Sequence, residues 1–152
     1  MNASKAAGTR WETAVVGYLR AWWPTIDRRP LSGRYDKGDI KYGPKNWTVE
    51  CKNEERIRLP HYLRQARVEA ANNGDSWFVA VVRNRRGKMS TGAVEDAFAV
   101  MPLRLWAELV AEHERLKDWH DTELLPLAQS LLDRQLGGRP PGRFLAVSDL
   151  LK

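Results

Sequence analysis

The sequence has one cysteine, Cys51, among 152 residues, so no disulfide can form within the chain. No apolar run approaches the roughly 20 residues that a membrane span requires, and the first ten residues, MNASKAAGTR, lack the apolar core of a signal peptide. With only three histidines and one cysteine, a zinc site is not favoured. These absences predict a cytoplasmic protein that makes no membrane contact.

Positive charge is concentrated in the first part of the chain. Residues 1–90 contain 18 Lys or Arg and 9 Asp or Glu, whereas residues 91–152 contain 7 and 10. Such an asymmetry favours a polyanionic partner for the first part. The alternative is a basic protein without a nucleic-acid role, because charge alone does not identify a ligand.

Hydrophobic periodicity predicts an α/β fold with a mixed sheet flanked by helices. Helices are expected over residues 4–22, 59–74, 102–117 and 122–136. Strands are expected over residues 25–29, 39–42, 46–52, 76–82 and 95–101. The strands over 39–42 and 46–52 are expected to pair as a hairpin. We expect residues 1–101 to form the core and 102–152 to add C-terminal helices and a tail.

Three charged side chains are predicted to converge on neighbouring strands. Alternation along residues 46–52 directs Glu50 and Lys52 to one face and Cys51, as a buried thiol, to the other. Asp39 opens the preceding strand, and Glu12 lies beside the apolar stripe of the first helix. Carboxylates held close together are costly unless a cation neutralises them, and such oxygen ligands suit Mg²⁺ or Mn²⁺. The alternative is an ordinary solvent-exposed ion pair.

The spacing of these residues resembles a nuclease signature. Asp, about ten residues, then Glu-x-Lys is the pattern of the PD-(D/E)XK nucleases, and Asp39, Glu50 and Lys52 match it. With Glu12 on the upstream helix and Ser32 in the loop, residues 5–85 resemble the Holliday junction resolvases of that superfamily, the archaeal type and its phage relatives. The resemblance implies a restriction-endonuclease-like fold and Mg²⁺-dependent cleavage of four-way DNA junctions in a bacterial or phage-infected cell.

The resemblance also assigns roles to the clustered residues. Asp39 and Glu50 would bind Mg²⁺, or Mn²⁺ in its place, with the Cys51 carbonyl as a third ligand. Lys52 would position the attacking water, and Glu12 would complete the metal site directly or through water.

The same resemblance assigns roles to two further residues, and the sequence departs from the family pattern at two positions. Ser32 would contact the junction near the scissile phosphate, and Gln65 matches a helix glutamine found near the site in many members of the superfamily. Gly38 stands where the family often has proline. Asp36, three residues before Asp39, is an alternative metal ligand.

DNA phosphates are expected to be contacted by residues of the basic segments around these strands. The candidates are Arg10, Arg28, Arg29, Ser32, Arg34, Lys37, Arg83, Arg85 and Arg86. Matched cuts on opposing strands need two active sites, so a homodimer is expected, with the apolar C-terminal helices at its interface or on the core. A different nicking or restriction-type nuclease and a non-catalytic DNA-binding module remain as alternatives.

Overall fold

The computed structural model describes residues 3–30, 33–85 and 94–135. The helices are α1 (Ala3–Leu19), α2 (Leu59–Asn73), α3 (Leu103–Trp119) and α4 (Leu125–Gln135), and the strands are β1 (Asp27–Arg28), β2 (Ile40–Lys41), β3 (Trp47–Lys52), β4 (Trp77–Val82) and β5 (Phe98–Val100). The chain divides into two compact units, residues 1–105 and 106–152, whereas the sequence suggested a boundary after residue 101. Ser32, Arg86 and the tail over 144–152 lie outside the described residues.

The first unit contains a mixed sheet, which confirms the α/β class. Its strand order is β3-β4-β5, with β3 and β4 parallel and β4 and β5 antiparallel. Parallel neighbours need a crossover connection, and α2 supplies it. Pro60 lies in the first turn of α2, and Gly74 ends it in the left-handed conformation, as the sequence predicts.

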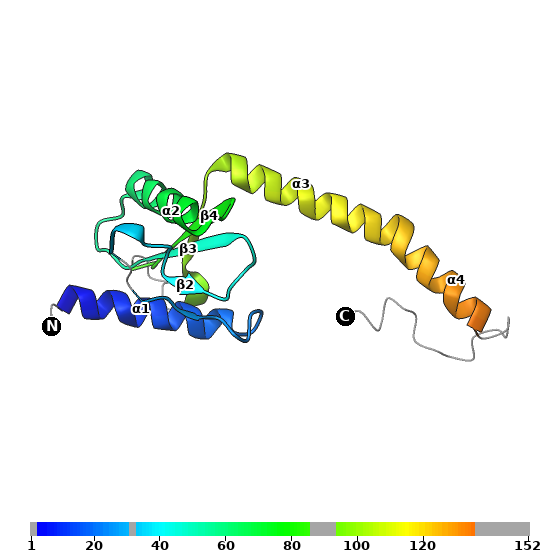
Figure 1. Cartoon of the computed structure of the whole chain (residues 1–152), viewed down its shortest axis with the longest axis horizontal. Coiled ribbons are helices and arrows are strands. Elements are labelled where there is room, and N and C mark those ends of the chain that lie inside the picture. Colours follow the sequence, from blue (N-terminus) through cyan, green and yellow to red (C-terminus); the bar gives the residue numbers. More distant parts are fainter. Residues whose placement is uncertain (1–2, 31–32, 86–93, 136–152) are drawn as a thin grey trace. The chain divides into compact units, whose positions relative to one another are not determined.

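Helices cover both faces of this sheet, with α2 on one side of β3 and β4 and α1 on the other (Figure 1). On the α1 side, Val49 and Val79 join a core that includes Trp11 and Val15. On the α2 side, Phe78 packs with alanines of that helix. The central strand β4 is therefore buried on both faces, as its continuous apolar sequence predicts.

The predicted hairpin between residues 39–42 and 46–52 is wrong. β2 pairs antiparallel with β1 instead, in a separate two-stranded sheet. The connection to β3 contains Tyr42 and Asn46 at positive φ, and Pro44, which has no N–H to extend a ladder. β2 still approaches β3 at its start, where the Asp39 N–H donates to the Val49 carbonyl at 3.1 Å.

Two predicted helix boundaries also change. The first helix ends at Leu19, and Trp22, assigned to its apolar stripe, is 59% exposed. The two C-terminal helices form one run, because a π-helical turn over His120–Leu124 joins them. Pro126 follows this turn, and the altered hydrogen bonding accommodates a residue that would otherwise break the helix. Among the described residues, none of the helices combines the length and apolar character needed to cross a membrane.

Gly38 permits the close approach of the chain before β2 to β3. Its φ is +84°, and a Cβ built there would lie 2.7 Å from Thr48 Cγ2 and 3.2 Å from the Val49 carbonyl oxygen. Glycine alone adopts this conformation without a clash. Proline, which the resemblance suggests here, is excluded because its φ is fixed near −65°.

Replacing Gly38 therefore tests how tightly Asp39 is held. We expect Gly38→Ala to lower the free energy of unfolding by about 2–5 kcal/mol, since strain at positive φ adds to overpacking. Gly74→Ala is the matched control, because Gly74 has φ +78° and no atom within 4 Å of its built Cβ. Denaturant unfolding of both variants measures the difference, and equal losses would contradict the packing role of Gly38.

Candidate active site

Glu50 and Lys52 lie on the face of β3 that α2 covers. Alternation along the strand puts them on one face as predicted, but this face is not open to water. Glu50 is 3% exposed, and the Lys52 side chain is 11% exposed. The two side chains form an ion pair. The structure therefore contradicts the alternative of an ordinary surface ion pair.

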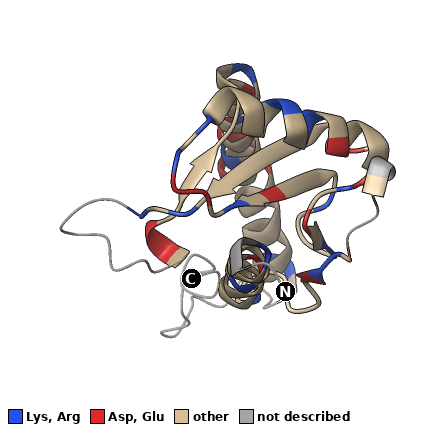
Figure 2. Ribbon diagram, turned by 90° about the vertical axis from the view of Figure 1, so that its left-hand side faces the viewer, with Lys and Arg blue, Asp and Glu red and all other residues tan. Residues whose placement is uncertain are grey.

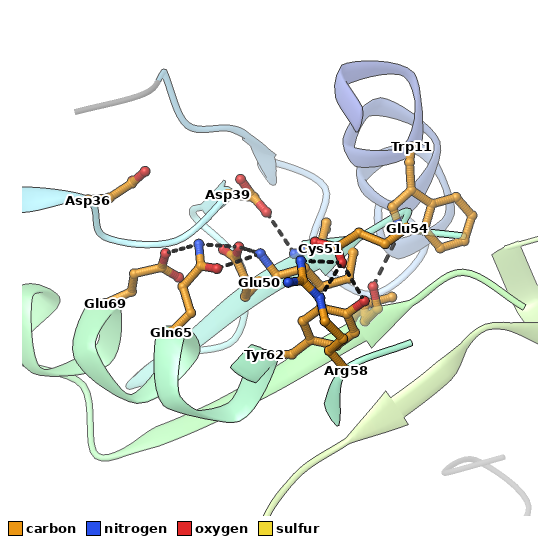
Figure 3. A network of polar contacts seen from close by, with 12 residues as sticks. Trp11, Asp36, Asp39, Glu50, Cys51, Glu54, Arg58, Tyr62, Gln65 and Glu69 are labelled. Carbon is orange, nitrogen blue, oxygen red and sulfur yellow. Dashed lines mark hydrogen bonds and ion pairs between the residues drawn. The ribbon is translucent and has the colours of Figure 1, made fainter. Parts of the chain in front are cut away.

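Gln65 of α2 connects the residues of this buried group (Figure 3). Lys52 Nζ donates to Gln65 Oε1 at 2.7 Å. Gln65 Nε2 in turn donates to Glu50 Oε1 and to Glu69 Oε1, both at 2.9 Å. The amide orientation is fixed by these partners, because its oxygen faces an ammonium group and its nitrogen faces two carboxylates. The predicted residues Glu50, Lys52 and Gln65 are thus brought together.

Glu69 belongs to the same group, and the sequence analysis missed it. It is 3% exposed, and its Oε2 is buried without a hydrogen-bond partner in the described structure. Burial raises the pKa of Glu69, with the charges of Asp39 and Asp36 adding to the rise against the hydrogen bonds from its neighbours. The sequence feature that could have predicted Glu69 in the site is its position one turn after Gln65, on the helix face that also carries the buried Ala66.

Asp39 lies at the edge of β3 beside this group. Its Oδ2 accepts a hydrogen bond from the Cys51 N–H at 2.7 Å. Burial raises the pKa of Asp39 to about 8, the nearby Glu50 charge adds to the rise, and the Cys51 N–H opposes it. Burial also raises the pKa of Glu50 to about 8, with Glu69 adding and Lys52 opposing. Two carboxyl groups that resist ionisation are therefore held together.

Lys52 keeps its proton despite its burial. Burial by itself lowers the pKa of this ammonium group, but the Glu50 charge and hydrogen bond outweigh it, so the pKa is raised. The ammonium also lies 5.7 Å from the centroid of the Tyr62 ring. At neutral pH, Lys52 can donate hydrogen bonds to a water or a phosphate oxygen, and it cannot serve as a general base.

Glu12 and Asp36 lie differently relative to the carboxyl groups of Asp39 and Glu50. Glu12 Oε2 accepts a 2.8 Å hydrogen bond from Arg28 Nε, and its charge contributes to the raised pKa of Asp39. Asp36 stands apart from Glu50 (Figure 3), and its Oδ1 accepts the N–H of the next residue, Lys37, at 2.8 Å. The geometry therefore favours Asp39 over Asp36 as the partner of Glu50.

Several predicted DNA contacts are engaged with the protein itself. Arg28 is paired with Glu12, Arg83 lies over the Trp11 ring at 5.5 Å, and Arg85 Nε donates to Asn53 at 2.9 Å. Of the remaining predicted contacts, Arg10 and Lys37 are exposed and Arg29 is half-buried. Ser32, Arg86 and the side chain of Arg34 lie outside the described part of the structure.

The carboxylate oxygens of the site are the atoms that could bind a divalent cation. No three His, Cys, Asp or Glu side chains of the described residues are gathered as a ready-made metal site. Mg²⁺, however, commonly uses one or two carboxylates and keeps several waters. Asp39 and Glu50 are two such carboxylates, and burial together with the charge of a neighbouring carboxyl group raises the pKa of each. A hard cation fits this pair.

Comparison of the chain with protein-family models, with curated protein sequences and with solved structures gave no match.

The two raised pKa values predict how stability depends on pH. Asp39 and Glu50 titrate near 8 when folded, far above their ordinary values of 3.8 and 4.5. The folded state then holds more protons than the unfolded state between about pH 4 and 8, so stability without metal falls as pH rises through that window. Mg²⁺ binds the ionised carboxylates, so its stabilising effect should grow over the same window.

Thermal melts near pH 5 and near pH 8, with a chelator or with Mg²⁺, measure both effects. The double variant Asp39→Asn with Glu50→Gln serves as control, since it should have a flatter pH profile and no Mg²⁺ effect. A wild-type melting temperature that is insensitive to Mg²⁺ at both pH values would contradict the cation site.

Proposed function

We propose that this protein is a Mg²⁺-dependent, structure-selective DNA endonuclease with a restriction-endonuclease-like fold, and that its substrate is the four-way junction. One observation supports the chemistry above all others. The half-buried Asp39 and the buried Glu50 adjoin a protonated lysine, Lys52, whose position α2 fixes through Gln65. The basic first part of the chain supports a nucleic-acid substrate.

Each residue of the group has a distinct task in this reaction. Asp39 and Glu50 would hold the cation, which when bound supplies charge for the phosphate and lowers the pKa of water. Lys52 donates a hydrogen bond that orients the attacking water or stabilises a phosphate oxygen. The water oxygen forms a bond to phosphorus as the bond to O3′ breaks, the water proton passes to solvent, and the leaving 3′ oxygen takes up a proton.

Gln65 and Glu69 act as positioning residues in this scheme. With Glu50 engaged in holding a cation, Lys52 would still have the Gln65 oxygen as an acceptor, and Glu69 accepts a hydrogen bond from the nitrogen of that amide. Gln65 would thus keep Lys52 in place without its ion pair to Glu50. This arrangement favours an enzyme over a non-catalytic DNA-binding module, which gains nothing from burying ionisable groups beneath a helix.

The junction substrate calls for two chains, and the second unit offers a surface for assembly. Large apolar side chains of α3, of α4 and of the π-helical turn between them are exposed to water in this unit, and α4 has no buried residue. These side chains are Trp106, Leu109, Leu116, Trp119, Leu124, Leu127, Leu131 and Leu132. Leu105, which begins the apolar pattern of α3 in the sequence, does not belong to this exposed set and is buried in the first unit with Phe78. An exposed stripe of this size is typical of an interface.

Substitutions in the site test the chemistry. We expect Lys52→Ala, Asp39→Asn and Glu50→Gln each to reduce DNA cleavage at least about 100-fold, since each removes charge stabilisation needed in the transition state. Lys52→Ala should leave DNA affinity nearly unchanged. Asp36→Asn is the matched control for Asp39→Asn and should cut at close to the wild-type rate. Gel assays with radiolabelled junction and linear duplex, with and without Mg²⁺, measure these rates. Near wild-type cleavage by Lys52→Ala would refute the assignment.

Assembly separates a junction resolvase from other nucleases of this superfamily. We expect sedimentation at micromolar concentration to show a dimer, and a junction to be cut symmetrically in two opposing strands. Leu127→Glu with Leu131→Glu should shift the dimer toward monomer, because both exposed leucines would lie in the interface. A stable wild-type monomer that nicks linear duplex as readily as a junction would leave the nuclease chemistry intact and remove the junction from the proposal.

A further inference from the structure

Helix α2 presents two chemically different faces. Its inner face carries Gln65 and Glu69 of the candidate site. Its outer face carries Arg64 and Arg67, both exposed. Within the described residues, neither arginine has a hydrogen bond or an ion pair. Figure 2 shows basic segments, in blue, along the helix that lies over the sheet. Two unpaired guanidinium groups are therefore carried by the helix that also fixes Lys52.

Arg64 lies between two hollows of the first unit. The first, of about 440 Å³, is lined by Gln65 and Glu69 of the candidate site and also by Asp36. The second, of about 350 Å³, has an apolar floor that includes Phe78, and its lining arginines are Arg64, Arg67 and Arg104. Arg64 lines both hollows, so the arginines begin next to the candidate site and continue away from it.

The charges at the site explain why such a surface is needed. The candidate site holds the carboxyl groups of Glu50 and Glu69, both hydrogen-bonded to Gln65, with Asp39 beside them. A nucleic-acid backbone is repelled by carboxylates unless cations hold it close by. Several arginines predicted to do so are already paired with the protein, as Arg28 is with Glu12. Unpaired arginines must then supply the attraction.

The spacing of Arg64 and Arg67 suits a phosphate backbone. Residues three apart on a helix have Cβ atoms about 5–6 Å apart and point the same way. Two long side chains from such positions can reach successive phosphates of one strand. Guanidinium groups also bind phosphate oxygens in a bidentate manner, which ammonium groups cannot do.

We propose that the outer face of α2, through Arg64 and Arg67, binds backbone phosphates of the DNA strand next to the cleavage position. This inference rests on the proposed function for the identity of the substrate. Neither arginine was among the DNA contacts expected from the sequence. The contact is to phosphate, so it carries no base specificity.

The test compares two double variants of equal charge. Arg64→Gln with Arg67→Gln removes the proposed contacts, and glutamine preserves helix propensity at exposed positions. Arg20→Gln with Lys45→Gln is the matched control. Both control residues are exposed cations, and Lys45 precedes the start of β3, the opposite end from Lys52. Fluorescence anisotropy with a labelled four-way junction, in Ca²⁺ to slow cleavage, gives the dissociation constant over a series of monovalent salt concentrations.

We expect the α2 double variant to bind on the order of 10–100-fold more weakly at 0.1 M salt, and the slope of log affinity against log salt to decrease by about 1.8 for two lost phosphate contacts. The control variant should keep the wild-type slope. The inference would be overturned by an α2 variant whose slope equals that of the wild type. It would also be overturned by a control variant that loses as much affinity as the α2 variant.

Cleavage by the wild type in Mg²⁺ distinguishes this inference from the proposed function. If the wild type binds DNA but does not cut it, and the α2 variant loses affinity and slope, the phosphate contact stands and the nuclease proposal fails. If the wild type cuts DNA and the α2 variant binds with unchanged slope, the nuclease proposal stands and the α2 contact fails. A wild type that binds no DNA overturns both.

Discussion

The burial of the Glu50 carboxylate between the sheet and α2 is the constraint on which the rest of the structure depends. A carboxylate at 3% exposure loses the hydration that stabilises its charge, so the protein must supply partners. Lys52 comes from the same strand, and Gln65 comes from the covering helix. α2 is therefore joined to β3 by hydrogen bonds and charge as well as by apolar contact, and this fixes its register along the strand.

The same constraint explains the unusual composition of the layer between α2 and the sheet. Phe78, Ala80 and Val82 of β4 supply the apolar contacts, whereas the facing side chains of β3 are polar. Thr48 donates to the Asp75 carboxylate at 2.7 Å, and the fully buried Tyr62 donates through its hydroxyl to Glu54 at 3.0 Å. Such a layer is less stable than an apolar one unless every group is satisfied. Within the described residues, the buried Glu69 Oε2 has no hydrogen-bond partner, so this layer is not fully satisfied.

A buried group that is incompletely neutralised is a feature of functional sites more than of structural cores. Asp39 adds to the excess of carboxyl groups, and Gly38 allows it to lie there because no Cβ obstructs the approach to Thr48. The backbone thus accepts a left-handed residue in order to bring a second carboxyl group beside Glu50. On the opposite face of α2, Arg64 and Arg67 have no ion-pair partner among the described residues. The helix consequently separates an interior suited to a cation from an exterior suited to phosphate.

Much of the local structure is determined by the sequence itself. The buried character of β4 follows from its continuous apolar run, and the ends of α2 follow from Pro60 and Gly74, because these signals act over a few residues. The alternation that places Glu50 and Lys52 on one face is equally local. The proximity of Asp39 to Glu50 was predicted from a hairpin that does not form, and the two side chains come close because the chain before β2 approaches β3 instead.

Tertiary structure alone decided which elements meet. The connection from β2 to β3 departs from a hairpin through positive φ angles at Tyr42 and Asn46, and the residue type of Tyr42 does not signal such a conformation. The burial of Glu50 depends on α2 covering a face that alternation by itself leaves open to water. Glu69 enters the site because the crossover brings α2 over β3, and Arg28 is occupied because α1 places Glu12 beside it. The chain encodes the side chains locally, whereas desolvation and pairing arise only when distant segments pack together.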